Sequence, residues 1–233
     1  MLLWMHGRTV DRFLDPGRHL RLMRAGIGVC AIDLPGHGDR LDPRMQRPEA
    51  MPHIVREALE EIDEVLDEAI ELGGFDPNRV AIGGMSAGGM IALARLADPV
   101  RPRRFAAATV ECTSGAWRPL PWWPLASRIA ELEPAAHAAT WPPVPLLLLH
   151  NRLDEWVPLA AEQAFVDAIR PRYEPPHGDP ADLEFVVFDR TGAPQEHAGF
   201  GRRAAEAKDR MVAFLRRHLA LPASGDSSTR IDR

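Results

Sequence analysis

The residues most suggestive of chemistry lie at positions 82–90, where the chain reads IGGMSAGGM. One serine, Ser86, stands among four glycines, directly after an apolar run and directly before a helical pattern. Glycine-rich turns at such a junction cradle a phosphate, close a tight structural turn or expose a nucleophile. The residues around Ser86 decide among the three.

Residue identities around Ser86 argue against both phosphate-binding motifs. A dinucleotide fingerprint that begins at Gly84 requires glycine at position 86, and one that begins a residue earlier requires glycine where Met85 stands. A phosphate loop requires lysine after its second glycine, but a further glycine follows Gly88. Lys208 is the only lysine of the chain and lies in a charged helical pattern. We therefore expect no nucleotide bound at this turn and no Schiff-base chemistry.

Residues 84–88 match G-x-S-x-G and stand where a predicted strand turns directly into a helix. A serine at the apex of such a turn leaves no room for side chains two residues before and two residues after it. Its hydroxyl projects beyond the carboxyl end of the sheet, close to the free N–H groups at the start of the helix. We predict that Ser86 is a nucleophile; the alternative is a tight turn that happens to hold a serine.

A nucleophilic serine needs a general base and an acid that orients the base, and both should follow at the ends of later strands. Asp154 lies four residues after the predicted strand 144–150, where its alternative role is to cap the next helix. Glu111, which ends the preceding strand, is the alternative acid, although a structural or pocket role suits it better. Of nine histidines, only His197 falls between the last predicted strand and the closing helix. The predicted triad is Ser86, Asp154 and His197, and the alternative for the histidine is a solvated loop residue.

The tetrahedral intermediate of such a reaction also needs hydrogen-bond donors for its oxyanion. The backbone N–H of Ala87 is one, because Ala87 follows the nucleophile. The turn MHGRT after the first predicted strand supplies the second, from the N–H of Arg8 or of Thr9. A single donor of this kind contributes on the order of 2.7–4 kcal/mol of transition-state stabilisation.

Short apolar runs alternate with helical patterns along the chain, which is typical of parallel βαβ units. Six runs are predicted to be strands: 2–7, 28–33, 79–84, 105–112, 144–150 and 183–188. The clearest helix covers 54–72 and ends at two glycines, and further helices are predicted at 11–25, 87–97, 159–170 and 202–219. We expect one α/β domain over residues 1–221 and a disordered polar tail over 222–233.

Residues 113–143 interrupt this alternation, because they hold four tryptophans and six prolines and show no strand pattern. A long insert of this kind is usually a lid or a binding loop. We expect it to cap a substrate pocket, and the alternative is a surface segment whose tryptophans cover the sheet. The candidate substrate contacts are Met85, Trp117, Trp122 and Trp123.

Composition argues against several classes of partner. The formal net charge of −5 provides no basic footprint for nucleic acid or an anionic membrane. No apolar run approaches the ~20 residues of a membrane span, and the first residues lack a signal-peptide layout. Cys30 and Cys112 have neither disulfide-framework nor metal-site spacing, which is typical of buried thiols in a reducing cytosol. We expect a cytoplasmic protein without a metal.

Several motifs resemble, in order, those of the α/β-hydrolase superfamily: HG at 6–7, DLPGHGDR at 33–40, GMSAG at 84–88, LDEWVP at 153–158, and His197. The segment FDPNRVAIGGMSAGG is similar to that of dienelactone-hydrolase-like and prolyl-oligopeptidase-like serine esterases. The resemblance covers roughly residues 1–219. It implies a mostly parallel sheet with helices on both faces, Ser86 as nucleophile, Asp154 as acid, His197 as base, and no cofactor.

The sequence departs from the family pattern at three places. Family members usually have two further strands before the HG strand, and none is predicted here. Either the start of the sequence is placed too late, or the sheet has a truncated, exposed edge through which a homodimer could form. Asn151 stands where the acid loop more often has glycine, a change that bears on the shape of the loop and not on its chemistry. Dienelactone hydrolases proper commonly use a cysteine nucleophile, so Ser86 argues against that activity.

The leading hypothesis is a serine carboxylesterase that cleaves a small-molecule ester through an acyl-enzyme. A peptidase or a thioesterase would use the same chemistry. A non-catalytic scaffold that binds a small ligand is the rival from another class, and loss of a triad member would favour it. Haloalkane- and epoxide-type hydrolases place a carboxylate at the turn, where this chain has Ser86.

Overall fold

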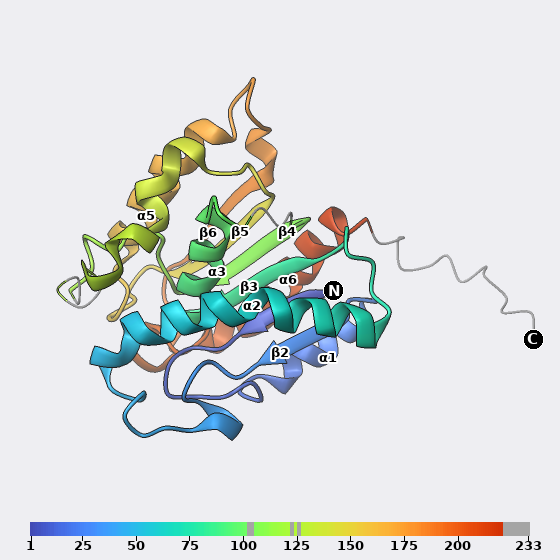
Figure 1. The fold of residues 1–233 in the computed structure, drawn as a ribbon. Helices are drawn as coiled ribbons and strands as arrows, with labels where there is room; N and C mark the ends of the chain where they lie inside the picture. Colours follow the sequence, from blue (N-terminus) through green and yellow to red (C-terminus); the bar gives the residue numbers. More distant parts are fainter. Residues whose placement is uncertain (102–104, 122–123, 125–126, 221–233) are drawn as a thin grey trace, which may run out of the picture.

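Six parallel strands form the centre of the protein, seen in a computed structural model that describes residues 1–101, 105–121, 124 and 127–220 (Figure 1). In spatial order they are β2 (Val29–Ile32), β1 (Leu2–Met5), β3 (Ala81–Met85), β4 (Ala107–Glu111), β5 (Leu146–Asn151) and β6 (Leu183–Phe188). Met5 is paired with both Ile32 and Gly84, so three strands end at one level of the sheet. The carboxyl ends of all six strands therefore face one edge, where their loops meet.

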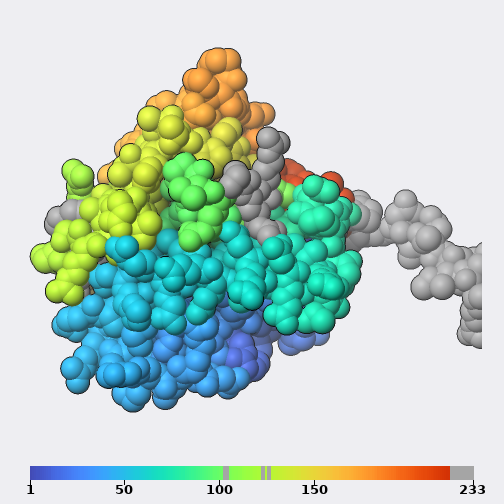
Figure 2. Space-filling model, viewed as in Figure 1, coloured from blue at the N-terminus to red at the C-terminus, as the bar shows by residue number. Residues whose placement is uncertain are grey.

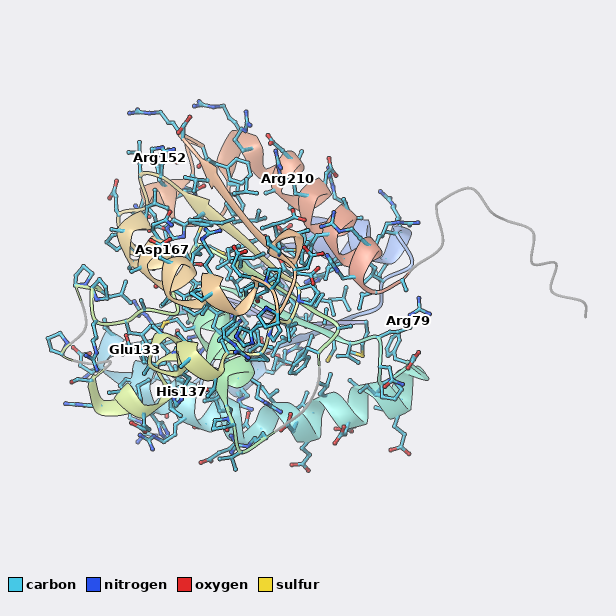
Figure 3. The ribbon with its side chains drawn as sticks, turned by 90° about the horizontal axis from the view of Figure 1, so that it is seen from above. Arg79, Glu133, His137, Arg152, Asp167 and Arg210 are labelled. Carbon is cyan, nitrogen blue, oxygen red and sulfur yellow. The ribbon has the colours of Figure 1, made fainter. Side chains whose placement is uncertain are left out.

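Helices cover both faces of this sheet, as predicted. On one face, α2 (Met51–Gly73), α3 (Ala87–Ala97) and α5 (Leu159–Ile169) pack on alternate strand residues such as Leu3 and Ile82. On the other face, α1 (Pro16–Arg24) and α6 (Ala204–His218) pack on residues of the opposite parity such as Leu2 and Ala81. Seen from above, α2 lies on one side of the sheet and α6, marked by Arg210, on the other (Figure 3). Because successive residues of each strand point to opposite faces, the sheet has one hydrophobic core on each face.

The two outer strands of the sheet are β2 and β6. All four residues of β2 are half-buried, whereas the neighbouring β1 is fully buried. α2 and the segment that precedes it occupy the lower part of the face seen in Figure 2. An open β2 edge agrees with the expected sheet, and its pairing with a second copy of the chain stays a prediction.

The described part of the tryptophan-rich segment folds into two 3₁₀ helices, η3 (Ser127–Leu132) and η4 (Pro134–Thr140), and η4 packs against α3 and α5. Trp117 and Trp141 are fully buried in the core. Trp117 Nε1 donates a hydrogen bond to Ser114 O at 3.0 Å. The predicted contact between Trp117 and a substrate is therefore wrong, because its indole is buried in the core of the protein. Trp122, Trp123 and the tail predicted to be disordered lie outside the described residues.

Candidate active site

The turn between β3 and α3 consists of Ser86 alone, with φ 52° and ψ −115°. This backbone conformation is unfavourable for a residue with a side chain, and the surrounding packing has to hold it. A Cβ on Gly84 would overlap the backbone of Gly88, and a Cβ on Gly88 would overlap the carbonyl groups of Met5 and His6. The two glycines of G-x-S-x-G are thus required by the close approach of α3 to the ends of β3 and β1.

The remaining two glycines of the segment are also required by close packing. A Cβ on Gly83 would overlap the carbonyl oxygen of Thr109 in the neighbouring strand β4. A Cβ on Gly89 would overlap the side chain of Thr113, which follows β4. The Thr113 hydroxyl in turn donates to Ser86 O at 2.8 Å. Both outer glycines therefore let β4 approach the turn that carries Ser86.

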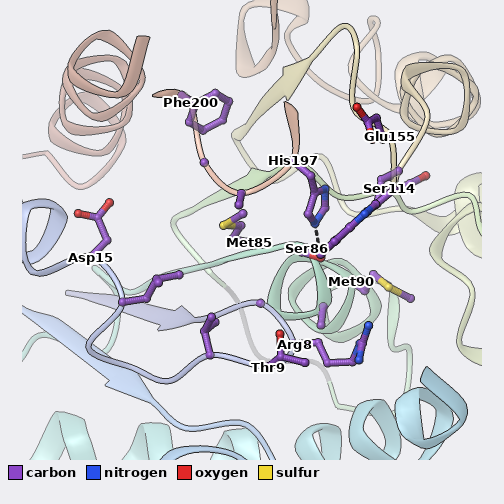
Figure 4. A pocket seen from close by; sticks show the side chains of 18 of the residues that line it. Arg8, Thr9, Asp15, Met85, Ser86, Met90, Ser114, Glu155, His197 and Phe200 are labelled. Carbon is purple, nitrogen blue, oxygen red and sulfur yellow. Dashed lines mark hydrogen bonds between the residues drawn. The ribbon is translucent and has the colours of Figure 1, made fainter. Parts of the chain in front are cut away.

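Ser86, His197 and Asp154 come together at the carboxyl edge of the sheet, and Figure 4 shows the hydrogen bond between Ser86 and His197. His197 Nε2 is 2.9 Å from Ser86 Oγ, and His197 Nδ1 is 2.8 and 3.0 Å from the two oxygens of Asp154. Since Asp154 Oδ atoms accept from Nδ1–H, Nε2 is left to accept the proton of the serine hydroxyl. Asp154 and His197 are 7% and 2% exposed, so both hydrogen bonds lie away from bulk water.

The carboxylate of Asp154 is held by the chain that follows it. Its Oδ1 also accepts hydrogen bonds from the backbone N–H groups of Trp156 and Val157, at 2.9 and 2.8 Å. Helix α5 begins later, with Pro158 at its N-cap position and no side-chain cap. Asp154 therefore does not cap that helix, and its second oxygen is left for His197.

Glu111, the alternative acid, takes part in a different interaction. Its Oε2 accepts a hydrogen bond from Arg18 Nη2 at 2.8 Å, and both side chains are buried. Burial raises the pKa of Glu111, while Arg18 opposes the shift. The backbone oxygen of Glu111 accepts from Ser86 N at 2.9 Å. Glu111 supports the turn, in keeping with the structural role favoured from the sequence.

Two backbone N–H groups beside Ser86 are available to an oxyanion. Arg8 and Ala87 both line the cavity that contains Ser86, and within the described residues neither amide donates a hydrogen bond. The turn that carries Arg8 is held by His6, whose Nδ1 is 2.6 Å from Gly7 O and whose Nε2 accepts from Leu34 N. Because Nε2 accepts, Nδ1 is the protonated nitrogen of a neutral imidazole. Burial lowers the pKa of His6, which agrees with this form.

Residues 2–226 match the model of the alpha/beta hydrolase family. The chain belongs to this family. The protein TT1662 of Thermus thermophilus is 27% identical to this hydrolase, with a TM-score of 0.72, over 95% of this chain and 89% of that one. A monoacylglycerol lipase of Paleococcus ferrophilus is 18% identical, with a TM-score of 0.66, over 93% and 94% of the two chains.

An acylaminoacyl peptidase of Pyrococcus horikoshii is 17% identical to the hydrolase, with a TM-score of 0.68. The match covers 96% of this chain and 38% of the peptidase. At such identities the likeness to the lipase and to the peptidase shows a shared fold alone. No curated protein matches the sequence.

The carboxyl edge of the sheet holds a cavity of about 770 Å³, whose wall includes Ser86 and His197. This volume suits a small organic molecule. Much of its wall is apolar, and Met85 belongs to that wall. Its contact with a substrate stays a prediction. The insert contributes Ser114 and Pro121 among the described residues. Other apolar wall residues are Val10, Leu14, Pro48, Met51, Met90, Val157, Ala198, Phe200 and Ala204.

Among the described tryptophans, Trp156 is the one that lines the cavity, and sequence reasoning missed it. Its ring centroid is 4.8 Å from that of His197, with the planes tilted by 39°. The side chain is 49% exposed, in contrast to Trp117, which is completely buried. Trp156 stands two residues after Asp154, so its position in the acid loop was the one signal that could have identified it.

Asn151 connects the loop that carries Asp154 to the loop that carries His197. Its Nδ2 donates to Glu196 O at 2.6 Å and to Gly199 O at 2.8 Å, on either side of His197. The carboxylate of Glu196 accepts from the N–H and hydroxyl groups of Thr191 and from the N–H of Gly192. The residue that replaces the usual glycine therefore has a specific use, which is to position the loop that carries His197.

The described residues also bear on whether the hydrolase can hold a metal ion. No group of three or more His, Cys, Asp and Glu side chains in this part of the chain is arranged to bind one. The helices of the same part include none that is long and apolar enough to cross a membrane.

Proposed function

We propose that this hydrolase cleaves carboxylic esters of small molecules through an acyl-enzyme on Ser86. The observation that carries the proposal is the continuous chain of hydrogen bonds from Ser86 through His197 to Asp154, with Ser86 in the wall of a largely apolar cavity. A hydroxyl, an imidazole and a buried carboxylate in this order are the arrangement that activates a serine at neutral pH.

The reaction has two halves. Ser86 Oγ attacks the carbonyl carbon while His197 Nε2 takes the hydroxyl proton, and the carbonyl oxygen becomes an oxyanion beside the N–H groups of Arg8 and Ala87. The carbon–oxygen bond to the alcohol then breaks, and His197 returns the proton to the departing alcohol. Water attacks the acyl-enzyme with His197 again as base, which releases the carboxylic acid and restores Ser86.

Thioesters and amides react by the same steps, so the choice of bond depends on the substrate that the cavity accepts. A non-catalytic scaffold is disfavoured because Ser86, His197 and Asp154 are all within hydrogen-bonding distance of their partners. A panel of one acyl group carried as p-nitrophenyl ester, thioester and p-nitroanilide separates the remaining alternatives. We expect the ester to have the highest kcat/KM, and a comparable value for the anilide would favour a peptidase.

Hydrolysis of p-nitrophenyl acetate and butyrate tests the nucleophile. Ser86→Ala is expected to lower kcat by at least ~10³-fold, and His197→Ala by a similar factor, because triad members act as a unit. Ser127→Ala and His177→Ala, at exposed positions outside the cavity, are matched controls that should retain the wild-type rate. Wild-type activity in Ser86→Ala would refute the assignment, and loss of activity in His177→Ala instead of His197→Ala would move the base.

A further inference from the structure

The side chain of Arg8 also lines the cavity that contains Ser86. The side chain is half-buried, and its Nη1 donates a hydrogen bond to Gln46 O at 2.6 Å. Within the described residues no carboxylate lies within 4.0 Å of its guanidinium, although Glu49 acts on it from a greater distance. Burial lowers the pKa of Arg8, which indicates a cation that has lost part of its hydration.

The other cations of the cavity wall are neutralised. Lys208 Nζ donates to Asp15 Oδ1 at 2.8 Å. Arg18 donates to Glu111 at 2.8 Å and to Asp15 at 3.3 Å. Arg8 is therefore the cavity cation that lacks a carboxylate partner among the residues that the structure describes. In the view of Figure 4, Asp15 lies to the left of Ser86 and Arg8 lies below it.

Most donors of the Arg8 guanidinium remain available. The group carries five N–H donors, and one of its nitrogens has a hydrogen-bond partner among the described residues. None of the other nitrogens is a buried atom without a partner, so they are accessible from the cavity or from solvent. A guanidinium with free N–H groups in a fork matches the two oxygens of a carboxylate.

The surroundings favour an anion at this end of the cavity. Pro48, Met51 and Met90 contribute apolar wall, and an ionic hydrogen bond is stronger in such surroundings than in water. The remaining acidic residue of the wall, Glu155, is exposed to solvent. The backbone N–H of Arg8 is the proposed oxyanion donor, so an acyl group held there has its carbonyl beside the residue whose side chain carries the charge.

We propose that Arg8 binds a carboxylate at the far end of the acyl group, so that the preferred substrates are monoesters of short dicarboxylic acids. This inference rests on the proposed ester cleavage at Ser86. The side chain of Arg8 would then select the substrate, while its backbone N–H would serve the reaction itself.

Two esters of equal shape test the inference: mono-p-nitrophenyl adipate and p-nitrophenyl 6-methylheptanoate, in which an isopropyl group replaces the carboxylate. For the wild type we expect kcat/KM for the adipate to exceed that for the neutral ester by ~10- to 100-fold, the range of a hydrogen-bonded ion pair. Arg8→Met should reduce this ratio to about one, and Arg8→Lys, which keeps the charge without the fork, should give an intermediate ratio.

Arg44→Met is the matched control, because Arg44 is 88% exposed, pairs with Asp42 and lies outside the cavity wall. It should leave the ratio at the wild-type value. Ser86→Ala should abolish hydrolysis of both esters, and activity in that variant would refute the ester cleavage itself. A wild-type ratio of one or less, or an unchanged ratio in Arg8→Met, would overturn the carboxylate site while leaving the ester cleavage standing. Should Arg8→Met fail to fold, the wild-type ratio and Arg8→Lys still decide.

Discussion

The imidazole of His197 is held on three sides. Asp154 binds its Nδ1, Ser86 approaches its Nε2, and Trp156 covers its ring at a centroid distance of 4.8 Å. In the proposed reaction this ring gains a positive charge when it takes the serine proton. An indole close to a forming cation stabilises it through the ring quadrupole and also shields it from water.

Trp156 lines the cavity, and in the proposed reaction we expect it to contribute to the rate as well. We expect Trp156→Ala to lower kcat for p-nitrophenyl butyrate by about 5- to 30-fold, which corresponds to the 1–2 kcal/mol of a partly desolvated cation–π contact. Trp156→Phe, which keeps an aromatic face, should recover most of the loss, whereas Trp156→Leu should not. Equal rates for the leucine and phenylalanine variants would assign Trp156 to packing alone.

The strand–turn–helix element from β3 to α3 depends on an approach of backbone to backbone. Gly88 lies where α3 meets the end of β1, and a Cβ there would overlap two carbonyl groups. Backbone atoms cannot move aside as a flexible side chain can, so the helix itself would have to shift. Such a shift would also displace Ser86 from His197.

Gly88→Ala is expected to lower the free energy of unfolding by about 3 kcal/mol, the upper end of the usual effect of overpacking. Urea denaturation followed by circular dichroism measures this change. Gly17→Ala is the control, since a Cβ at Gly17 would meet its nearest atoms at 3.4 and 3.6 Å, which are ordinary contacts. A Gly88→Ala protein as stable as the Gly17→Ala protein would contradict the argument.

The sequence predicts these helices and strands well where the apolar residues recur with one regular spacing. All six strands lie within a residue or two of the expected runs, because each is an apolar run followed by a turn. The helix predicted at 11–25 begins only at Pro16, where Asp15 accepts the N–H of Arg18 as its cap. The 3₁₀ helices η3 and η4 were not predicted, since the prolines of that segment conceal any period.

At the candidate site, it could be predicted which residues come together where a proposed role restricts the residue type and its place in the chain order; the roles themselves stay predictions. Ser86, Asp154 and His197 are of this kind, because the turn, the acid loop and the base loop each restrict the choice. Contacts between loops could not be predicted, because nothing in the local sequence relates Asn151 to Glu196 and Gly199. Nor does composition show that Trp117 enters the core while Trp156 faces the cavity.

Across the whole molecule, two buried carboxyl groups stand out on opposite faces of the sheet. Glu111 is paired with Arg18 beside α1. Glu162 in α5 has no charged partner among the described residues: a backbone N–H of Gly115 is its hydrogen-bond donor, and its Oε2 has no partner. Burial raises the pKa of Glu162 well above its ordinary value of 4.5. The folded protein therefore holds this carboxyl in its neutral form more strongly than the unfolded chain does.

The stability of the protein should consequently depend on pH through Glu162. Above about pH 4.5 the unfolded chain loses this proton while the folded protein retains it, so the free energy of unfolding falls as pH rises and levels off only above the pKa of the folded state. Glu162→Gln removes this titration, and its stability relative to the wild type should increase by about 1.4 kcal/mol for each unit by which the folded pKa is raised. Urea denaturation at pH 4.5, 6 and 7.5 measures the difference. Glu68→Gln, at an exposed position of α2, is the control, and its difference in the free energy of unfolding from the wild type should not grow comparably with pH. If the difference for Glu162→Gln stays constant over this pH range, the carboxyl of Glu162 is ionised in the folded protein.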